Sequence, residues 1–317
     1  MKTCTWILGL TGVVVIAGTL VMAAPTQTAT SKTLDTATIE RLTGMKGQYK
    51  AEEGVFKVDA PRADLAVTVA GVKMIPPMGL TSYAAFMPAG DRVMVMGDTV
   101  LLEDQVNPVM DAALANGLEV TALHNHFFWD TPKVMFMHIG GMGNLETLAS
   151  AVGKVFAKIK ETSGFAGPRP VVTLDPQQTS LDPKQLDQVL GQHGDFAKGV
   201  YKATIGGTTR MAGHEVGTTM GVNTWAAFVG SDAQAAVDGD FVMRETELQT
   251  VLKTLRRAGI NIVAIHNHVE GESPRIVFLH YWGVGPASEL AKGIRAALDT
   301  QKVRTTRGGK PMSGKHS

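Results

Sequence analysis

The chain contains a single cysteine, Cys4, among its 317 residues. One cysteine excludes an intrachain disulfide framework and any zinc site built from several thiolates. A surplus of charge of one sign is also missing, because 30 Lys and Arg residues face 29 Asp and Glu residues. Nucleic-acid-binding proteins usually present a basic face, so this balance argues against a nucleic-acid partner. Any chemistry must therefore come from His, Asp, Glu, Ser and the backbone.

Long hydrophobic runs are scarce as well, and the clearest one is Trp6–Met22, which carries no charge. Its length of about 17 residues suits the core of a signal peptide better than a spanning helix of roughly 20. With Lys2 before it and small residues at Val21 and Ala23, we expect a signal peptide over residues 1–23, cleaved after Ala23. An uncleaved N-terminal anchor is the alternative. The mature chain is then expected to be periplasmic or secreted, with no membrane span and with a polar linker over residues 24–33.

The sequence contains an internal repeat with an offset of 142 residues. Residues 78–143 align without a gap to residues 220–285, and 21 of these 66 positions are identical, where unrelated sequences would share roughly 4. The hydrophobic content of 44% is enough for a folded core. We therefore expect copy one over residues 34–163 and copy two over residues 181–302, with a proline-containing connector over 164–180. The tail, residues 303–317, has no apolar pattern and is expected to be disordered.

The two copies predict the same order of elements. In copy one, a short helix around Ile39 precedes strands that include residues 83–87 and 92–102, and a helix follows with apolar residues at helical spacing from Val106. Pro108 indicates that this helix begins late. Strands over 119–127 and 133–139 and a helix over 145–159 complete the copy. The predicted fold class is α+β, a tandem duplication of a helix–strand unit with mostly antiparallel sheets, the two copies packing as a pseudo-dimer.

Six histidines form two identical patterns of the type His-x-His-x11-His. They are His124, His126 and His138 in copy one and His266, His268 and His280 in copy two. Residues i and i+2 of a strand point to the same face, and antiparallel pairing across a turn at residues 130–132 would place the third histidine opposite the first. Three imidazoles on one spot predict a divalent-metal site in each copy. Zn, Fe, Mn, Ni and Cu are not distinguished by this ligand type.

Carboxylates shared by both copies are candidates for a further role. Glu103 and Glu245 are interpreted either as residues that stabilise a helix N-terminus or as a fourth ligand or general base acting on metal-bound water. Asp98 and Asp240 follow a glycine in each copy, and a turn is the favoured interpretation for both.

Two weaker patterns lie near the third histidine of copy one. Gly140–Gly143 precedes a helix, and we interpret it as a tight connection, with anion binding by the helix N-terminus as the alternative. Met135 and Met137 flank His138 and are expected to fill the core, with a copper site of mixed His and Met ligands as the alternative.

Several longer motifs resemble the LppY/LpqO family. They are Val120–His126, Met135–Ile139, Asn223–Phe228, Gly259–His268 and Val277–Trp282. The resemblance covers residues 34–302. The family is named after exported lipoproteins and is catalogued as a domain of unknown function, so the resemblance implies export and the tandem arrangement and supplies no reaction. This chain departs from the namesakes because no cysteine follows its signal.

Three functions remain open from the sequence. The first is an exported metal-dependent hydrolase, lyase or isomerase of small molecules, with Glu103 or Glu245 as the base. A pocket lined by Trp225, Trp282 or Trp129 would favour this function. The second is a periplasmic metal binder or carrier with an open site. The third is a structural or partner-binding protein whose histidines lie in an interface.

Overall fold

A computed structural model of the chain describes residues 34–163 and 171–301. The expected signal peptide, the linker, the start of the connector and the C-terminal tail lie outside the described residues. Among the helices that are described, none is long and apolar enough to cross a membrane.

Copy one contains three helices and nine strands within its described range. The helices are α1 (Thr36–Thr43), α2 (Glu103–Ala115) and α3 (Leu145–Glu161), and a 3-10 turn is η1 (Pro76–Met78). The strands are β1 (Gly47–Lys50), β2 (Val55–Pro61), β3 (Thr68–Val69), β4 (Val72–Lys73), β5 (Thr81–Ala89), β6 (Arg92–Leu102), β7 (Glu119–His124), β8 (Asp130–Thr131) and β9 (Val134–Gly143).

Copy two repeats this order, and only the β8 position lacks a named strand there. Its helices are α4 (Pro183–Leu190), α5 (Leu248–Arg257) and α6 (Ala287–Asp299), with 3-10 turns η2 (Pro176–Gln178), η3 (Thr218–Met220) and η4 (Glu245–Glu247). Its strands are β10 (Gly194–Ala197), β11 (Val200–Gly206), β12 (Thr209–Met211), β13 (His214–Val216), β14 (Asn223–Gly230), β15 (Ala235–Arg244), β16 (Asn261–His266) and β17 (Ile276–Gly285).

Twelve of the strands form one sheet in the order β1-β2-β5-β6-β9-β7-β16-β17-β15-β14-β11-β10. The second half of this order repeats the first half in reverse, because β16, β17, β15, β14, β11 and β10 are the counterparts of β7, β9, β6, β5, β2 and β1. Every strand pair of this sheet is antiparallel. The mixed α/β architecture with antiparallel pairing therefore agrees with the prediction.

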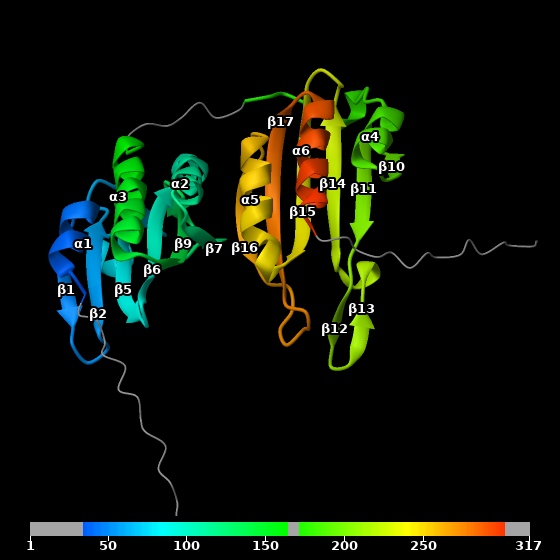
Figure 1. Cartoon of the computed structure of the whole chain (residues 1–317). Helices are drawn as coiled ribbons and strands as arrows, with labels where there is room; N and C mark the ends of the chain where they lie inside the picture. The colour runs from blue at the N-terminus through cyan, green and yellow to red at the C-terminus, as the bar shows by residue number, and fades with distance from the viewer. Residues whose placement is uncertain (1–33, 164–170, 302–317) are drawn as a thin grey trace, which may run out of the picture. The chain divides into compact units, whose positions relative to one another are not determined.

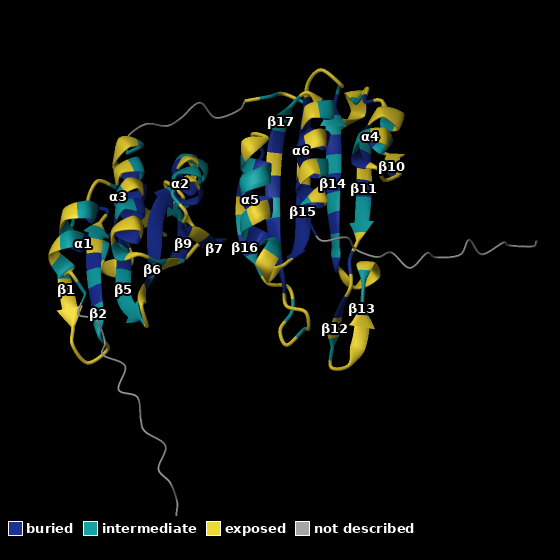
Figure 2. Ribbon diagram, in the orientation of Figure 1, coloured by how far each residue is buried: buried dark blue, intermediate teal, exposed yellow. Residues whose placement is uncertain are grey.

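The helices of each copy cover one face of its strands, as Figure 1 shows for α1, α2 and α3 and for α4, α5 and α6. Their buried stripes face the sheet and their exposed residues face outward (Figure 2). In α3 the stripe includes Leu148, Val152, Val155 and Ile159, and the Asn144 side chain caps the first turn by accepting from the Glu146 and Thr147 amides. We call the other side of the sheet the helix-free face, and it carries the residues that alternate with the core.

Two local predictions are wrong. Helix α2 already begins at Glu103 and keeps the exposed Pro108 in its interior, because the buried Val106, Val109 and Met110 hold the helix against the sheet. The glycines of Gly140–Gly143 do not form a connection, since they belong to β9 and pair with β6.

Strands β7 and β16 meet where the copies join, and Leu123 lies opposite Ile265. Two side-chain amides reinforce this junction. Asn107 of α2 bonds both to the Ile262 amide and to the Ile262 carbonyl, at 2.9 and 3.3 Å. At the equivalent position of copy two, Gln249 of α5 makes the same pair of bonds to the backbone of Val120, at 3.0 and 2.9 Å.

A carboxylate clamp joins the first helix of each copy to its edge strand. In copy two, Asp187 accepts from the Gly194 amide, the Tyr201 hydroxyl and the His193 ring. In copy one, Glu40 accepts from the Gly47 amide and from a lysine ammonium. A Cβ atom at Gly194 would lie 2.5 Å from the Tyr201 ring, so this position requires glycine.

Candidate metal centre

The histidines of both patterns lie on the helix-free face. In β7 and β9, Leu123 and Met137 are fully buried among the core residues on the helix side. Side chains alternate along a strand, so His124 and His138 project from the opposite face. Met135 lies on the same side as Met137, packed against the core. The alternative of a copper site with these two methionines as ligands is therefore wrong.

The strand register differs from the one that we predicted. Strand β7 ends at His124, so His126 lies in the following loop. His138 lies opposite Ala122 and His124 lies opposite Phe136, a shift of two residues from the predicted register. A bulge follows beyond these pairs, between Val120 and Ala122. Copy two has the same bulge and pairs His280 with Ala264 and His266 with Phe278. Because the shift is by two residues, the side chains remain on one face and are diagonal neighbours.

The three rings of copy one lie close together despite this shift. The Nε2 atoms of His138 and His124 are 3.0 Å apart. The ring centroids are 5.1 Å apart between His124 and His138 and 5.2 Å between His124 and His126. His124 and His138 are partly buried, whereas His126 is exposed.

Copy two gathers the equivalent rings in a different rotamer set. Here the Nε2 atoms of His266 and His268 are 3.0 Å apart, and the His266 and His280 centroids are separated by 4.6 Å. The same three positions therefore use two different histidine pairs in the two copies.

A phenylalanine supports each group from the strand side. The Phe136 ring stacks on His126 with centroids 3.5 Å apart, and the Phe278 ring stacks on His268 at 3.6 Å. Both phenylalanines are almost fully buried. The stacking fixes the position of the one histidine that no strand holds. The sequence signal was present, because this phenylalanine is identical in the two copies.

A buried carboxylate lies beside each histidine group, and the prediction of a turn there is wrong. Asp98 lies within β6 opposite His138, and Asp240 lies within β15 opposite His280. The two aspartates are only 8% and 6% exposed. Among the described residues, the Oδ1 atoms of both carboxylates have no hydrogen-bond partner. Asp240 oxygens lie 3.8 Å from His268 Nε2 and 3.9 Å from His280 Nδ1.

Burial controls the protonation of these groups. It raises the pKa of the Asp98 carboxyl, against the opposing influence of the nearby histidines, and it raises the pKa of Asp240 in the same way. Burial also lowers the pKa of His126 and of His268, and with the neighbouring rings it lowers the pKa of His266 to about 4. These histidines are therefore neutral at pH 7, which is the form that binds a metal ion.

The donor set suits a divalent transition metal, although it is not preformed. Within residues 34–163 and 171–301, no three or more His, Cys, Asp or Glu side chains already surround a common metal position. Two nitrogens 3.0 Å apart can both lie about 2.1 Å from one ion at an angle of about 90°. Small ring rotations and one Asp oxygen would complete a set of three imidazoles and one carboxylate.

Comparison with known proteins places the chain in a family. A family model described as Domain of Unknown Function (DUF1259) matches residues 37–158 and again residues 184–300. The chain belongs to the DUF1259 family. The double match also shows that the domain is duplicated.

No curated protein matches the chain. Among solved structures, the chain is similar to a trimeric bacterial microcompartment shell protein, PduB, at 13% identity. That match covers 80% of this chain and 89% of the other chain with a TM-score of 0.19, which is too low to support any statement about fold or function.

In both DUF1259 copies an aromatic ring borders the buried carboxylate. Tyr83 lies opposite Asp98 and Trp225 lies opposite Asp240. A lysine ammonium sits over each ring, with Lys57 Nζ 4.4 Å from the Tyr83 centroid and a second lysine 4.2 Å from the Trp225 centroid. The ring thus forms a wall of the site, held on its far side by a cation–π contact.

The two candidate glutamates of the DUF1259 copies lie apart from the buried aspartates. Glu103 is the first residue of α2 and Glu245 the first of η4, and both are exposed. Each follows the aspartate of its copy by five residues, a separation of roughly 16 Å along a strand. Their position at a helix start is the one that the helix dipole favours for a carboxylate.

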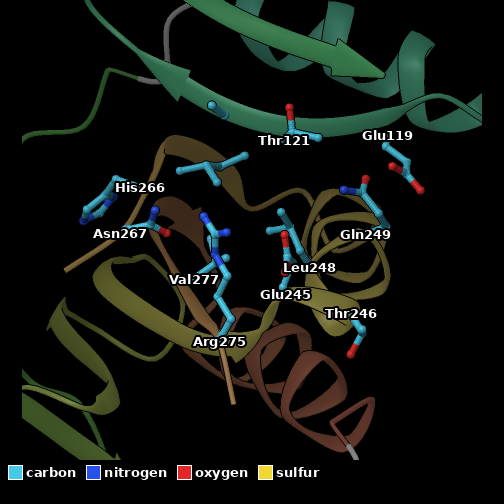
Figure 3. A pocket seen from close by; sticks show the side chains of 12 residues that line it. Glu119, Thr121, Glu245, Thr246, Leu248, Gln249, His266, Asn267, Arg275 and Val277 are labelled. Atoms are coloured by element: carbon cyan, nitrogen blue, oxygen red, sulfur yellow. The ribbon is translucent and has the colours of Figure 1, made fainter. Parts of the chain in front are cut away.

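A cavity of about 350 Å³ lies where β7 meets copy two of the DUF1259 protein, with Glu119, Glu245, Arg275 and His266 among its lining residues (Figure 3). Its wall includes Leu248 and Ile265, which are core residues on the helix side. His266 lies at the edge of this cavity in Figure 3, and its ring belongs to the helix-free face. Through His266 the cavity borders the histidine group of copy two, and Glu245 lines the same cavity.

Proposed function

We propose that this DUF1259 protein binds divalent transition-metal ions, one in each copy. The ligands are His124, His126 and His138 in copy one and His266, His268 and His280 in copy two, joined by Asp98 and Asp240. The observation that carries the proposal is the carboxylate oxygen that lies buried without a hydrogen bond beside three imidazoles, in both copies.

A buried carboxylate oxygen without a hydrogen bond is costly in a folded protein. Burying a polar atom without a partner costs about 1–3 kcal/mol, and more when the atom is charged. The arrangement nevertheless occurs twice, at positions that are 142 residues apart. A bound cation would supply the missing partner for Asp98 and Asp240 and would remove the penalty.

A binder or carrier fits the site best because the site is open. His126 and His268 are exposed on the helix-free face, so an ion can enter and leave without a movement of the backbone. A carrier requires this reversible access, and a structural site is usually closed.

A metal-dependent hydrolase, lyase or isomerase is the second candidate. The aromatic wall formed by Tyr83 or Trp225 beside each carboxylate favours it, because a substrate needs a surface next to the ion. A bound metal would lower the pKa of its water towards ~7. Glu103 and Glu245 remain predicted bases that no contact with the histidines supports.

We also propose export and a twofold relation between the copies. Export rests on the apolar run of residues 6–22 and on the LppY/LpqO resemblance, and N-terminal sequencing of the secreted chain should begin at Ala24. The pseudo-dimer is supported by the reciprocal amide bonds of Asn107 and Gln249.

The test is the metal content of protein exported without a histidine tag, measured by plasma mass spectrometry. We expect about two equivalents of one metal in the native protein, one in His124→Ala and none in the His124→Ala/His266→Ala double variant. The matched control is His193→Ala/His214→Ala, which removes two exposed histidines outside the sites. Metal loss in this control, or no binding by the native protein in calorimetric titration, would overturn the proposal.

A further inference from the structure

Two loops at one end of the strands carry large apolar side chains in copy one. Phe128 and Trp129 are 74% and 79% exposed, and their rings are 5.9 Å apart. Val72 and Ile75, in and after β4, are 55% and 47% exposed. We call these four residues the aromatic tip.

The two loops are held together by backbone bonds, so the tip is one surface. Strand β8 pairs with β3, which pairs with β4, in the rows Thr131-Thr68-Lys73 and Asp130-Val69-Val72. The Ala70 amide also donates to the Trp129 carbonyl at 3.3 Å. Val72 on β4 and the two aromatic residues directly before β8 therefore belong to one three-stranded sheet, with β3 between them.

Copy two builds the same scaffold without the apolar side chains. Arg210 and Ser273, the counterparts of Thr68 and Thr131, exchange two backbone hydrogen bonds. The turns match as well, since Ala70 and Ala212 have φ angles of 49° and 47°. At the exposed positions, however, copy two has His214, Gly217, Glu270 and Gly271 where copy one has Val72, Ile75, Phe128 and Trp129.

The backbone conformation at Trp129 disfavours a large side chain at this position. Trp129 has φ 61°, in the left-handed region that large side chains avoid, and its counterpart Gly271 has φ 76°. Glycine adopts this conformation without strain. Copy one therefore keeps an exposed indole at a strained position where a glycine would be more stable, which is the kind of strain found at functional sites.

The charge around the tip also differs between the copies. In copy one, Lys73 and Lys133 flank the tip, and the one carboxylate of these segments is Asp130, whose Oδ2 already accepts from the Val134 amide. In copy two, Glu215 stands at the position of Lys73, and three glutamates (Glu215, Glu270 and Glu272) outnumber the two basic residues Arg210 and Arg275. Apolar rings flanked by ammonium groups suit a surface that is apolar inside and anionic at its rim.

We propose that the aromatic tip docks copy one on the surface of an anionic lipid bilayer. Trp and Phe rings partition into the interfacial layer of a membrane, where the indole N–H stays hydrated. Lysines beside them attract anionic headgroups. Copy two lacks the exposed rings and the excess of basic over acidic residues and would remain in solvent, so docking uses one copy of the duplicated domain. The inference does not depend on the metal proposal.

The experiment uses exported protein and vesicles of phosphatidylcholine with or without phosphatidylglycerol. The test variant is Phe128→Glu/Trp129→Gly, which installs the copy-two residues and relieves the strain at Trp129. The control is Phe196→Glu, which removes a different exposed ring, on β10. Thermal melting confirms that each variant is folded.

We expect the native protein to sediment with the anionic vesicles and the double variant to partition about 100-fold less. Brominated lipids should quench part of the tryptophan emission of the native protein, and this part should be lost in Trp129→Gly. Lys73→Glu should weaken binding to anionic vesicles more than to neutral ones. The Phe196→Glu control should bind like the native protein.

Equal vesicle binding by the native protein and the double variant would overturn the proposal, as would a Trp129 that brominated lipids do not quench. Light scattering measures whether the tip instead mediates self-association of the protein. A native protein that dimerises without vesicles and becomes monomeric in the double variant would assign the tip to self-association and refute lipid docking.

Discussion

Removal of the buried carboxylates should stabilise the metal-free protein and destabilise the metal-bound one. The perturbation is the double variant Asp98→Asn/Asp240→Asn, which keeps the shape of each side chain and removes its charge. Both aspartates are more than nine-tenths buried, and each has an Oδ1 without a hydrogen bond among the described residues. An unsatisfied polar group costs about 1–3 kcal/mol, and an asparagine recovers part of this.

We therefore expect the metal-free double variant to be more stable than the native protein by about 1 kcal/mol per site. For a folded chain of this size, each kcal/mol raises the Tm by roughly 2–4 °C. With metal at a free concentration of 100 times its Kd, the native protein gains about 2.7 kcal/mol per site. The order of the two melting temperatures should then reverse.

The pH dependence gives the same prediction a second test. Burial raises the folded-state pKa of Asp98 and Asp240 above the value in the unfolded chain. Such a group contributes most stability below its unfolded pKa and loses it as the pH rises through the folded pKa. The stability advantage of the metal-free variant should therefore be present at pH 7 and should vanish in acid.

The assay is calorimetric or fluorimetric melting in the presence of a chelator and again with added metal. Asp238→Asn is the control, because Asp238 is an exposed carboxylate on the same strand, β15. It should change stability by less than about 0.5 kcal/mol. A metal-free double variant that is less stable than the native protein would refute the reasoning, as would an equal metal-induced rise in both Tm values.

Three further predictions concern the fold around the sites. Gly194→Ala should destabilise the protein by about 1–3 kcal/mol in denaturant unfolding because the new methyl group meets the Tyr201 ring. The control Gly140→Ala, whose Cβ has its nearest contact at 3.6 Å, should be close to neutral. Equal effects of the two substitutions would contradict this account. Asn107→Ala should cost about 1–3 kcal/mol by the same assay, since it leaves the Ile262 amide and carbonyl without partners at the junction of the copies, and an unchanged midpoint would mean that these bonds add nothing. The hydrogen bond to Asp187 raises the pKa of His193 above 6.5, so NMR titration should show a higher midpoint than for a free histidine, and this midpoint should fall in Asp187→Asn. The stability from this pair is complete below pH 6.5 and is lost as the pH rises through the folded pKa. A titration midpoint that the substitution does not move would exclude the pairing.

The sequence was sufficient to predict the repeat, the helices and the antiparallel strands, because all of these leave a periodic pattern of apolar residues. The strand register was not predictable, since nothing in the composition shows how many residues of the loop between the paired strands stay unpaired; His138 lies opposite Ala122 and His280 opposite Ala264, each two residues from the expected partner. The histidines nevertheless remain on one face, because the shift is an even number of residues.

The buried aspartates were missed for a different physical reason. Gly97 and Gly239 precede them, and a Gly-Asp pair is typical of a turn. In the structure both glycines lie within strands, where a Cβ at Gly97 would be 2.6 Å from the Tyr83 carbonyl and one at Gly239 would be 2.1 Å from the Tyr281 ring. These glycines permit close packing, and a single sequence does not distinguish that use from a turn.

The contact between β7 and β16 brings the two proposed ion sites close enough for their charges to interact. Leu123 lies opposite Ile265, so one further step of the antiparallel register makes His124 and His266 diagonal neighbours, about 7–8 Å apart. Two ions held there, each with one compensating carboxylate, would repel each other by about 0.5 kcal/mol in water and about 2 kcal/mol at an effective dielectric constant of 20. The second ion would then bind more weakly than the first, and added salt would narrow the difference, because the Debye length at physiological ionic strength is about 8 Å. Occupancy of one copy would thus be sensed by the other through the field alone, without any change of shape.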